Sequence, residues 1–348
     1  MSRRQTHIDA AKVLASHLIV LHHFTVYGPL AQALDLAAPR LTDWFYDYAR
    51  MAVQVFLVIG GYLAAGTLAP HGTLQHARPW RIVAQRYVRL ALPFGVALLL
   101  VVACSAVARQ WLQDDFIPPP PSIIGLLAHL VLLFDIFGVD PLSVGVWYVA
   151  IDFQLFAVMA VLLWVGGRAA QWLVGLCMLG SLFYFNLHEA VDSWALYFFG
   201  SYGMGAFAWW AGHSRHAGKW LGLLAVAGGA ALLWDFRLRI ALAVVVALGL
   251  GVARWRLGHD AGAKQAGTST PPSTALRVLR LLGRSSYALF LTHFTIVLLA
   301  NVLWVRLGWT GPGAAAWFMA AAWAACVVIS LLFERFVERP LSAVRIPA

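Results

Sequence analysis

The sequence predicts an all-α integral membrane protein with about ten transmembrane helices, one further re-entrant or interfacial helix, and both termini in the cytoplasm. Three observations support this class. The 348 residues are 61% hydrophobic and only 11% charged, whereas a soluble domain is about half apolar and a quarter charged. The apolar residues form runs long enough to cross a bilayer as helices. The short alternating segments typical of outer-membrane barrels are absent.

Ten apolar windows approach the twenty or so residues that a bilayer-spanning helix needs. They fall at about 10–29, 46–68, 86–108, 145–166, 170–186, 193–212, 218–235, 238–253, 285–306 and 313–334. An eleventh window, 123–137, is shorter and follows a run of four prolines, Pro118 to Pro121. It also contains His129 and Asp135. We therefore expect this segment to be a re-entrant or interfacial helix rather than a span.

The positions of the basic residues predict the orientation of the chain. A net charge of +10 is compatible with nucleic-acid binding, but the basic residues lie between the apolar windows. With the N-terminus inside and ten spans, 19 of the 25 Lys and Arg residues fall on the cytoplasmic side. The six outside are Arg40, Arg50, Arg109, Arg237, Arg239 and Arg306. Such an excess marks the cytoplasmic face, so the basic residues indicate topology and no nucleic-acid partner is expected.

The chain shows no internal repeat and no polar stretch long enough to fold by itself. We therefore expect one transmembrane domain over residues 1–348. Within it, residues 257–280 are rich in Gly, Ser, Thr and Pro. This composition is typical of flexible linkers, so the segment is expected to form a flexible cytoplasmic loop.

The helix expected at the first apolar window, with the residue just before it, carries an unusual set of ionisable residues, Asp9, Lys12, His22 and His23. Such residues are costly within a bilayer and usually serve a function there, and imidazole exchanges protons near neutral pH. Lys12 and His23 are separated by three helical turns, about 16 Å, and lie on one face. Asp9, three residues before Lys12, shares that side. For His22 the alternative is a hydrogen bond to a neighbouring helix.

Two arginines three residues apart, Arg86 and Arg89, begin the third apolar window. Residues at this spacing point the same way on a helix. Guanidinium groups bind phosphate through paired hydrogen bonds, so the pair is a candidate phosphate site. The alternative is an ordinary topology signal that contacts lipid headgroups.

Three further residues could take part in chemistry inside the membrane. Asp152 lies in the window 145–166, where a carboxylate needs a partner; a histidine would suit, because a carboxylate fixes the tautomer of an imidazole. Tyr287 and His293 lie in the window 285–306. A packed, hydrogen-bonded histidine remains the alternative for His293. The three cysteines occur at no metal-ligand spacing, and no metal site is expected.

Six short motifs occur along the chain in a fixed order. They are Asp9, Lys12 and His23; Phe56 to Tyr62; Arg86 and Arg89; Trp147, Tyr148 and Asp152; Gly283, Ser286, Tyr287, Leu289, Phe290, Leu291 and His293; and Glu338, Arg339 and Pro340. Each is weak alone, but together and at these helices they resemble the membrane acyltransferase 3 family. The resemblance runs from about residue 5 to residue 341.

The chain departs from the family pattern at three positions. Lys12 stands where the family usually has Arg, so a planar bidentate contact becomes a point charge. Asp152 replaces the usual Glu and shortens the reach of the carboxylate by one methylene. Gly60 stands where Ser is common. The charges at positions 12 and 152 are kept.

The resemblance implies a membrane O-acyltransferase, in the first place an O-acetyltransferase, of the bacterial inner (cytoplasmic) membrane. It would move an acyl group from cytoplasmic acetyl-CoA or another acyl-CoA to a hydroxyl of a cell-surface glycan or glycolipid. It implies that His23 acts as general base or transient acyl carrier, helped by Asp152 and Asp9. The residues that would bind the CoA phosphates are Lys12, Arg86 and Arg89. The other candidates are His22, Tyr287 and His293.

Two other classes remain as alternatives. A proton-coupled transporter or flippase of an anionic substrate also uses buried Asp and His residues, but it commonly has inverted repeats. A haem protein needs facing histidines on two helices. The sequence leaves open the acceptor, the length of the acyl group, direct transfer against an acyl-histidine intermediate, and the oligomeric state. Apart from the acceptor, membrane lipids are the expected partners.

Overall fold

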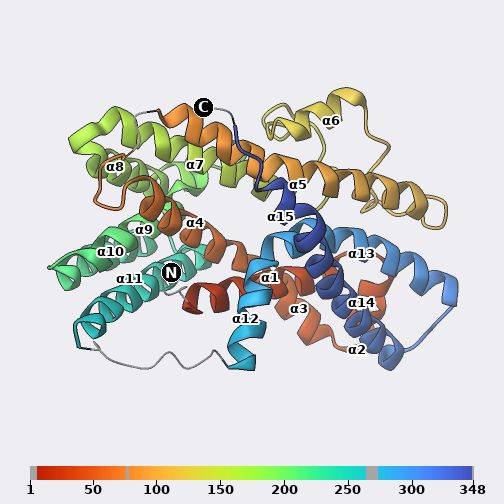
Figure 1. Cartoon of the computed structure of the whole chain (residues 1–348). Helices are drawn as coiled ribbons and strands as arrows, with labels where there is room; N and C mark the ends of the chain where they lie inside the picture. Colours follow the sequence, from red (N-terminus) through yellow and green to blue (C-terminus); the bar gives the residue numbers. More distant parts are fainter. Residues whose placement is uncertain (1–5, 76–77, 264–272, 347–348) are drawn as a thin grey trace. The chain divides into compact units, whose positions relative to one another are not determined.

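The computed structural model describes residues 6–75, 78–263 and 273–346. Over these residues the chain forms helices and connecting turns, and no strand occurs among them. Figure 1 labels the helices in chain order. The all-helical class that the sequence predicts is therefore confirmed.

Seven helical segments of the described residues are long and apolar enough to cross a membrane. They are Pro39–Leu68, Pro79–Ala108, Val146–Leu187, Ala217–Trp234, Leu238–Gly258, Ser286–Leu307 and Pro312–Leu341. An eighth is added if α1 (Thr6–Val26) and α2 (Gly28–Ala37), which meet at an angle of 92°, count as one bent span. The protein is thus a multi-pass membrane protein. The number of ten spans and the cytoplasmic termini remain predictions.

The chain divides into two compact units, each built from separate stretches of sequence. Unit 1 consists of residues 1–52, 85–150 and 275–348, and unit 2 of residues 53–84 and 151–274. The helices of unit 1 are α1, α2, α3 (Pro39–Tyr48), most of α5 (Pro79–Ala108), α6 (Ile123–Leu130), α12 (Thr274–Arg284), α13 (Ser286–Leu307), α14 (Pro312–Phe333) and α15 (Arg339–Leu341). Those of unit 2 are α4 (Val53–Leu68), most of α7 (Val146–Gly166), α8 (Ala170–Phe183), α9 (Ala195–His213), α10 (Ala217–Trp234) and α11 (Leu238–Ala263).

The window 123–137 does not form a spanning helix. Its helix, α6, has eight residues, about 12 Å of length, and Ser122 caps it by accepting a hydrogen bond from the N–H of Gly125. His129 is fully buried. Its Nδ1 donates to the carbonyl of Gly125, and its Nε2 accepts from the N–H of Leu142. The histidine of this segment is therefore a structural one.

The loop predicted for residues 257–280 is wrong at both of its ends, where the structure has helices. Helix α11 continues to Ala263, and α12 begins at Thr274. Residues 264–272, the middle of the expected loop, lie outside the described residues. The Ser and Pro residues that favoured a loop are concentrated just before α12, whereas 274–284 repeats Leu and Arg at helical spacing. This repeat gives α12 one apolar and one basic face.

The end of α1 in unit 1 is set by a sharp turn at Gly28. Gly28 has φ +84°, and a Cβ there would come within 2.5 Å of the Asn301 side chain. Asn301, on α13, accepts a hydrogen bond from the N–H of Leu30 and donates to the carbonyl of Tyr27. The buried amide thus satisfies backbone groups freed by the bend. The predicted window 10–29 overran the end of α1 because this partner is 271 residues away.

Helix α9 is the centre of unit 2 and packs against α4, α8, α10 and α11. Glycines bring α4 and α9 into backbone contact. A Cβ at Gly61 would lie 1.8 Å from the carbonyl oxygen of Tyr202, and one at Gly205 would lie 1.9 Å from that of Val58. Small residues at such crossings are typical of packed helices in membranes.

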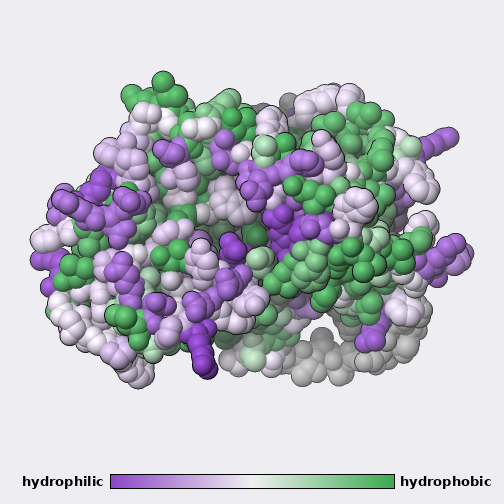
Figure 2. All heavy atoms as spheres, turned by 180° about the vertical axis from the view of Figure 1, so that it is seen from behind, coloured by the Kyte–Doolittle hydropathy of each residue, from purple (hydrophilic) through white to green (hydrophobic). Residues whose placement is uncertain are grey.

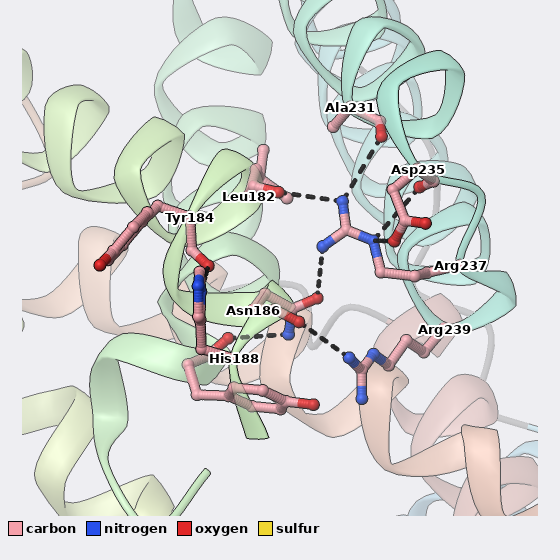
Figure 3. A network of polar contacts seen from close by, with 9 residues as sticks. Leu182, Tyr184, Asn186, His188, Ala231, Asp235, Arg237 and Arg239 are labelled. Atoms are coloured by element: carbon pink, nitrogen blue, oxygen red, sulfur yellow. Dashed lines mark hydrogen bonds and ion pairs between the residues drawn. The ribbon is translucent and has the colours of Figure 1, made fainter. Parts of the chain in front are cut away.

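A buried arginine joins three parts of unit 2 (Figure 3). Arg237 precedes α11 and is 9% exposed. Its guanidinium donates to the side chain of Asn186 and to the carbonyls of Leu182 and Ala231, and it pairs with the carboxylate of Asp235 at 3.1 Å. Because each helix leaves its last carbonyls unpaired, the arginine caps the ends of α8 and α10 together.

Large apolar side chains are common on the surface of the protein. Leu233, Trp172 and Trp317 are 92%, 77% and 80% exposed, and Figure 2 shows broad green areas on the face it presents. Soluble proteins rarely expose contiguous apolar surface on this scale. The surface therefore agrees with contact between these helices and lipid.

Candidate active site

His23 lies in the last turn of α1 and is 9% exposed. Three aromatic rings of unit 1 surround it. The centroids of His22 and His293 are each 5.0 Å from that of His23, and that of Tyr27 is 5.6 Å away. The His293 ring is inclined to the His23 ring by only 21°, so the two imidazoles stack. The structure thus brings three of the predicted residues, His22, His23 and His293, into one cluster.

The hydrogen bonds of His293 fix its tautomer. Its Nδ1 lies 2.7 Å from the carbonyl oxygen of Phe290 and 3.2 Å from that of Leu289. Because a carbonyl only accepts, Nδ1 carries the hydrogen, and Nε2 of the neutral ring bears a lone pair. His293 is fully buried. Among the described residues neither His293 Nε2 nor His23 Nδ1 has a hydrogen-bond partner.

His22 makes a different kind of contact. Its Nδ1 donates to the carbonyl of Phe45 at 3.0 Å and so ties α1 to α3. Its ring also lies 6.1 Å from that of Tyr46. For His22 the sequence allowed either a functional role or a hydrogen bond to a neighbouring helix, and this contact is a bond of the second kind.

The Asp9 side chain is buried against the end of α12. Asp9 is 5% exposed, and a Cβ at Gly283 would come within 2.9 Å of its Cβ. Asp9 also lies in the first turn of α1, where the helix dipole favours a negative charge. The carboxylate is thus held at the start of the helix that carries Lys12 and His23.

Two of the three basic residues of the predicted phosphate site lie near a carboxylate of unit 1. Glu338 accepts a hydrogen bond from the N–H of Ala288 and lies within electrostatic range of Arg89 and Lys12. It ends a π-helical turn, Glu334–Glu338, that continues α14. Such turns are rare in proteins, and those that occur often lie at functional sites. The structure therefore brings Lys12 and Arg89 around one acidic residue.

Tyr287 links two helices of this region. Its hydroxyl donates to the carbonyl of Leu90 at 3.1 Å, directly after Arg89 in α5. In the same helix, Pro93 has no N–H, so it does not make the usual helical hydrogen bond to the carbonyl of Arg89. Through this bond Tyr287 holds α13 to α5 beside the arginine.

Asp152 belongs to unit 2 and is 7% exposed. A Cβ at Gly60, on α4, would lie 3.5 Å from its Oδ1 and 3.1 Å from a ring carbon of Tyr202. The carboxylate therefore lies beside the position where the family commonly has Ser. Its expected pairing with His23, which belongs to unit 1, remains a prediction.

Sequence reasoning missed two contributions to the site. Glu338 was recognised only as part of a motif, and Gly283 was not expected to support Asp9. The motif positions were the available signal for both residues. Neither the π-helical turn nor the contact between α1 and α12 can be read from local sequence. Within the described residues no group of three or more His, Cys, Asp or Glu side chains is placed to hold a metal ion.

The comparison with protein families shows to which family the chain belongs. A family model described as an acyltransferase domain matches residues 6–335. The chain belongs to the acyltransferase 3 family. As a member, it is an acyltransferase that transfers groups other than aminoacyl groups. The match covers all of unit 2 and most of unit 1 of the acyltransferase, and it ends before Glu338. No curated protein and no solved structure matches the chain.

Proposed function

We propose that this acyltransferase moves an acyl group, in the first place acetyl, from cytoplasmic acyl-CoA to a hydroxyl of a cell-surface glycan or glycolipid. The proposed location is the bacterial inner membrane, with both chain termini in the cytoplasm. The observation that carries the proposal is His23, an imidazole buried in the membrane domain beside His293 and three turns along α1 from Lys12.

The donor is proposed to bind at the end of α1 that carries Lys12. CoA presents phosphate groups, which guanidinium and ammonium groups bind strongly. Lys12, Arg86 and Arg89 supply three positive charges in unit 1. Glu338, within electrostatic range of two of them, would hold these side chains in place until phosphates arrive. The acyl arm would then extend the roughly 16 Å that separate Lys12 from His23.

His23 is proposed to carry out the transfer in one of two ways. As general base it takes the proton of the acceptor hydroxyl while the oxygen attacks the thioester carbonyl. As nucleophile it forms an acyl-imidazole that the acceptor then attacks. In both cases the bond between the acyl carbon and sulfur breaks, and CoA leaves as a thiol. Burial of the ring supports either route, because it keeps competing water away.

The test uses purified protein in proteoliposomes with acetyl-CoA and a crude surface-glycan extract. We expect wild-type protein to release CoA, and His23→Ala to lower the rate by about 10²–10⁴-fold, the usual contribution of a positioned base. Arg89→Ala should raise the acetyl-CoA concentration needed for half-maximal rate. His17→Gln is the matched control. His17 lies in α1 like His23, but its ring accepts a hydrogen bond from Trp323 on α14 and is given no part in the transfer.

Wild-type protein that releases no CoA under these conditions would contradict the proposal. The alternative then to be tested is a proton-coupled transporter of an anionic substrate. Equal rates for the His23→Ala variant and wild type would remove His23 from the mechanism.

A further inference from the structure

The tautomer of the neutral His293 ring is fixed by its own helix. Nδ1 donates to the carbonyls of Phe290 and Leu289, and Nε2 faces no protein donor among the described residues. The ring is also completely buried. Buried polar atoms are nearly always hydrogen-bonded. An imidazole nitrogen with a free lone pair at such a position therefore fits a ligand that donates a hydrogen bond.

His23, the other well-buried histidine of the cluster, has a similar unpaired ring nitrogen. Its Nδ1 is likewise buried and has no hydrogen-bond partner within the described residues. The two rings stack at 5.0 Å, so they are neighbours without bonding one another. By contrast, the ring nitrogens of His129 are both used by the backbone. Three buried imidazole nitrogens lack a partner among the described residues. Two of them belong to the stacked pair where the acyl group is proposed to arrive, and the third, His7 Nε2, lies in the first turn of α1.

We propose that His293 is the catalytic base that deprotonates the acceptor hydroxyl, while His23 carries the acyl group. The inference rests on the proposed function and separates the two routes left open there. A hydroxyl can donate a hydrogen bond to the lone pair of an imidazole nitrogen. General-base catalysis requires such a hydrogen bond between the base and the group whose proton it removes. A carrier and a base on adjacent stacked rings satisfy this requirement together.

The two steps balance as follows. In the first, a His23 nitrogen attacks the thioester carbonyl, the bond from carbon to sulfur breaks, and the thiolate takes the proton that the His23 ring releases. In the second, the acceptor O–H bond breaks and its proton moves to His293 Nε2. The oxygen forms a bond to the acyl carbon, the bond from that carbon to the His23 nitrogen breaks, and the departing imidazole recovers the proton from His293.

The test compares His293→Gln with His23→Gln in proteoliposomes, using rapid mixing with acetyl-CoA and the crude surface-glycan extract. Glutamine accepts a hydrogen bond but does not take up a proton. We expect His293→Gln to release about one CoA per protein in a burst, and then to turn over at least about 10²-fold more slowly than wild type. The protein should keep the acetyl label, removable by hydroxylamine. His23→Gln should show neither burst nor label, and His17→Gln should behave as wild type.

Two results would overturn the inference. One is turnover of His293→Gln within about threefold of wild type, since loss of a base costs far more. The other is a folded His293→Gln variant, eluting from size exclusion as wild type does, that gives no burst. If this variant does not fold, His293→Asn is judged by the same criteria. Failure of the proposed function is distinguishable, because it would appear as a lack of CoA release by wild-type protein.

Discussion

Asp9 of α1 lies directly against the backbone of Gly283 in α12. A Cβ at position 283 would come within 2.9 Å of the Asp9 Cβ and 3.0 Å of its Oδ1, closer than side chains tolerate. The absence of a side chain at Gly283 therefore sets where the start of α1 lies. Lys12 is one turn further along the same helix.

We expect Gly283→Ala to impair acyl transfer without unfolding the protein. The added methyl group pushes Asp9 and the first turn of α1 away from α12, and small displacements of binding groups cost activity steeply, by about tenfold or more. The measurement is CoA release as a function of acetyl-CoA concentration. The control is Gly229→Ala in α10, where a Cβ meets nothing within 4 Å. Equal loss in both variants would show that helix propensity, not Asp9, is responsible.

The sequence predicted most of the helices because the apolar character and length of a run are local properties. Each of the ten windows lies largely or wholly within helices of the structure. The errors occurred where distant partners or weak local signals decide the structure. Asn301 ends α1 at the Gly28 turn from 271 residues away. Residues 274–280, which the composition predicts to be loop, form the first two turns of α12.

The candidate site was predictable as a set of residue types but not as a geometry. The spacing of Lys12 and His23 on one helix follows from the sequence alone. The stack of His23 on His293, and the hydrogen bond that fixes the His293 tautomer, depend on contact between α1 and α13. For His22 the sequence left a structural and a functional role open, and its bond to Phe45 supplies the structural one.

Arg237 should be important for the stability of unit 2. Its replacement by Ala leaves the Asn186 side chain and the carbonyl of Leu182 without their donor (Figure 3). Unsatisfied buried groups cost about 1–3 kcal/mol each, so we expect a clear fall in melting temperature in detergent. Arg237→Lys should rescue little, because a single ammonium does not replace the planar fork. Unchanged melting of Arg237→Ala would refute the capping role.

The fold should also lose stability in mild acid through His129. Burial lowers the pKa of His129 below its usual 6.5, opposed by the hydrogen bond to the Gly125 carbonyl. The unfolded chain therefore binds this proton more readily than the folded chain does, and stability falls as pH drops below 6.5. Melting temperatures at about pH 7.5 and about pH 5 should differ more for wild type than for His129→Gln. Parallel pH dependence in the two proteins would exclude His129 as the cause.

The relation between Asp152 and His23 can be tested by a double-mutant cycle. If the carboxylate orients the imidazole, Asp152→Asn matters only while His23 is present, so the double variant should be no slower than His23→Gln alone. If Asp152 instead supports unit 2 through its surroundings at Gly60 and Tyr202, the two effects should multiply. The measurement is CoA release by the wild type, both single variants and the double variant. Melting temperatures of the same four proteins provide the control, because a structural role lowers them and an orienting role does not.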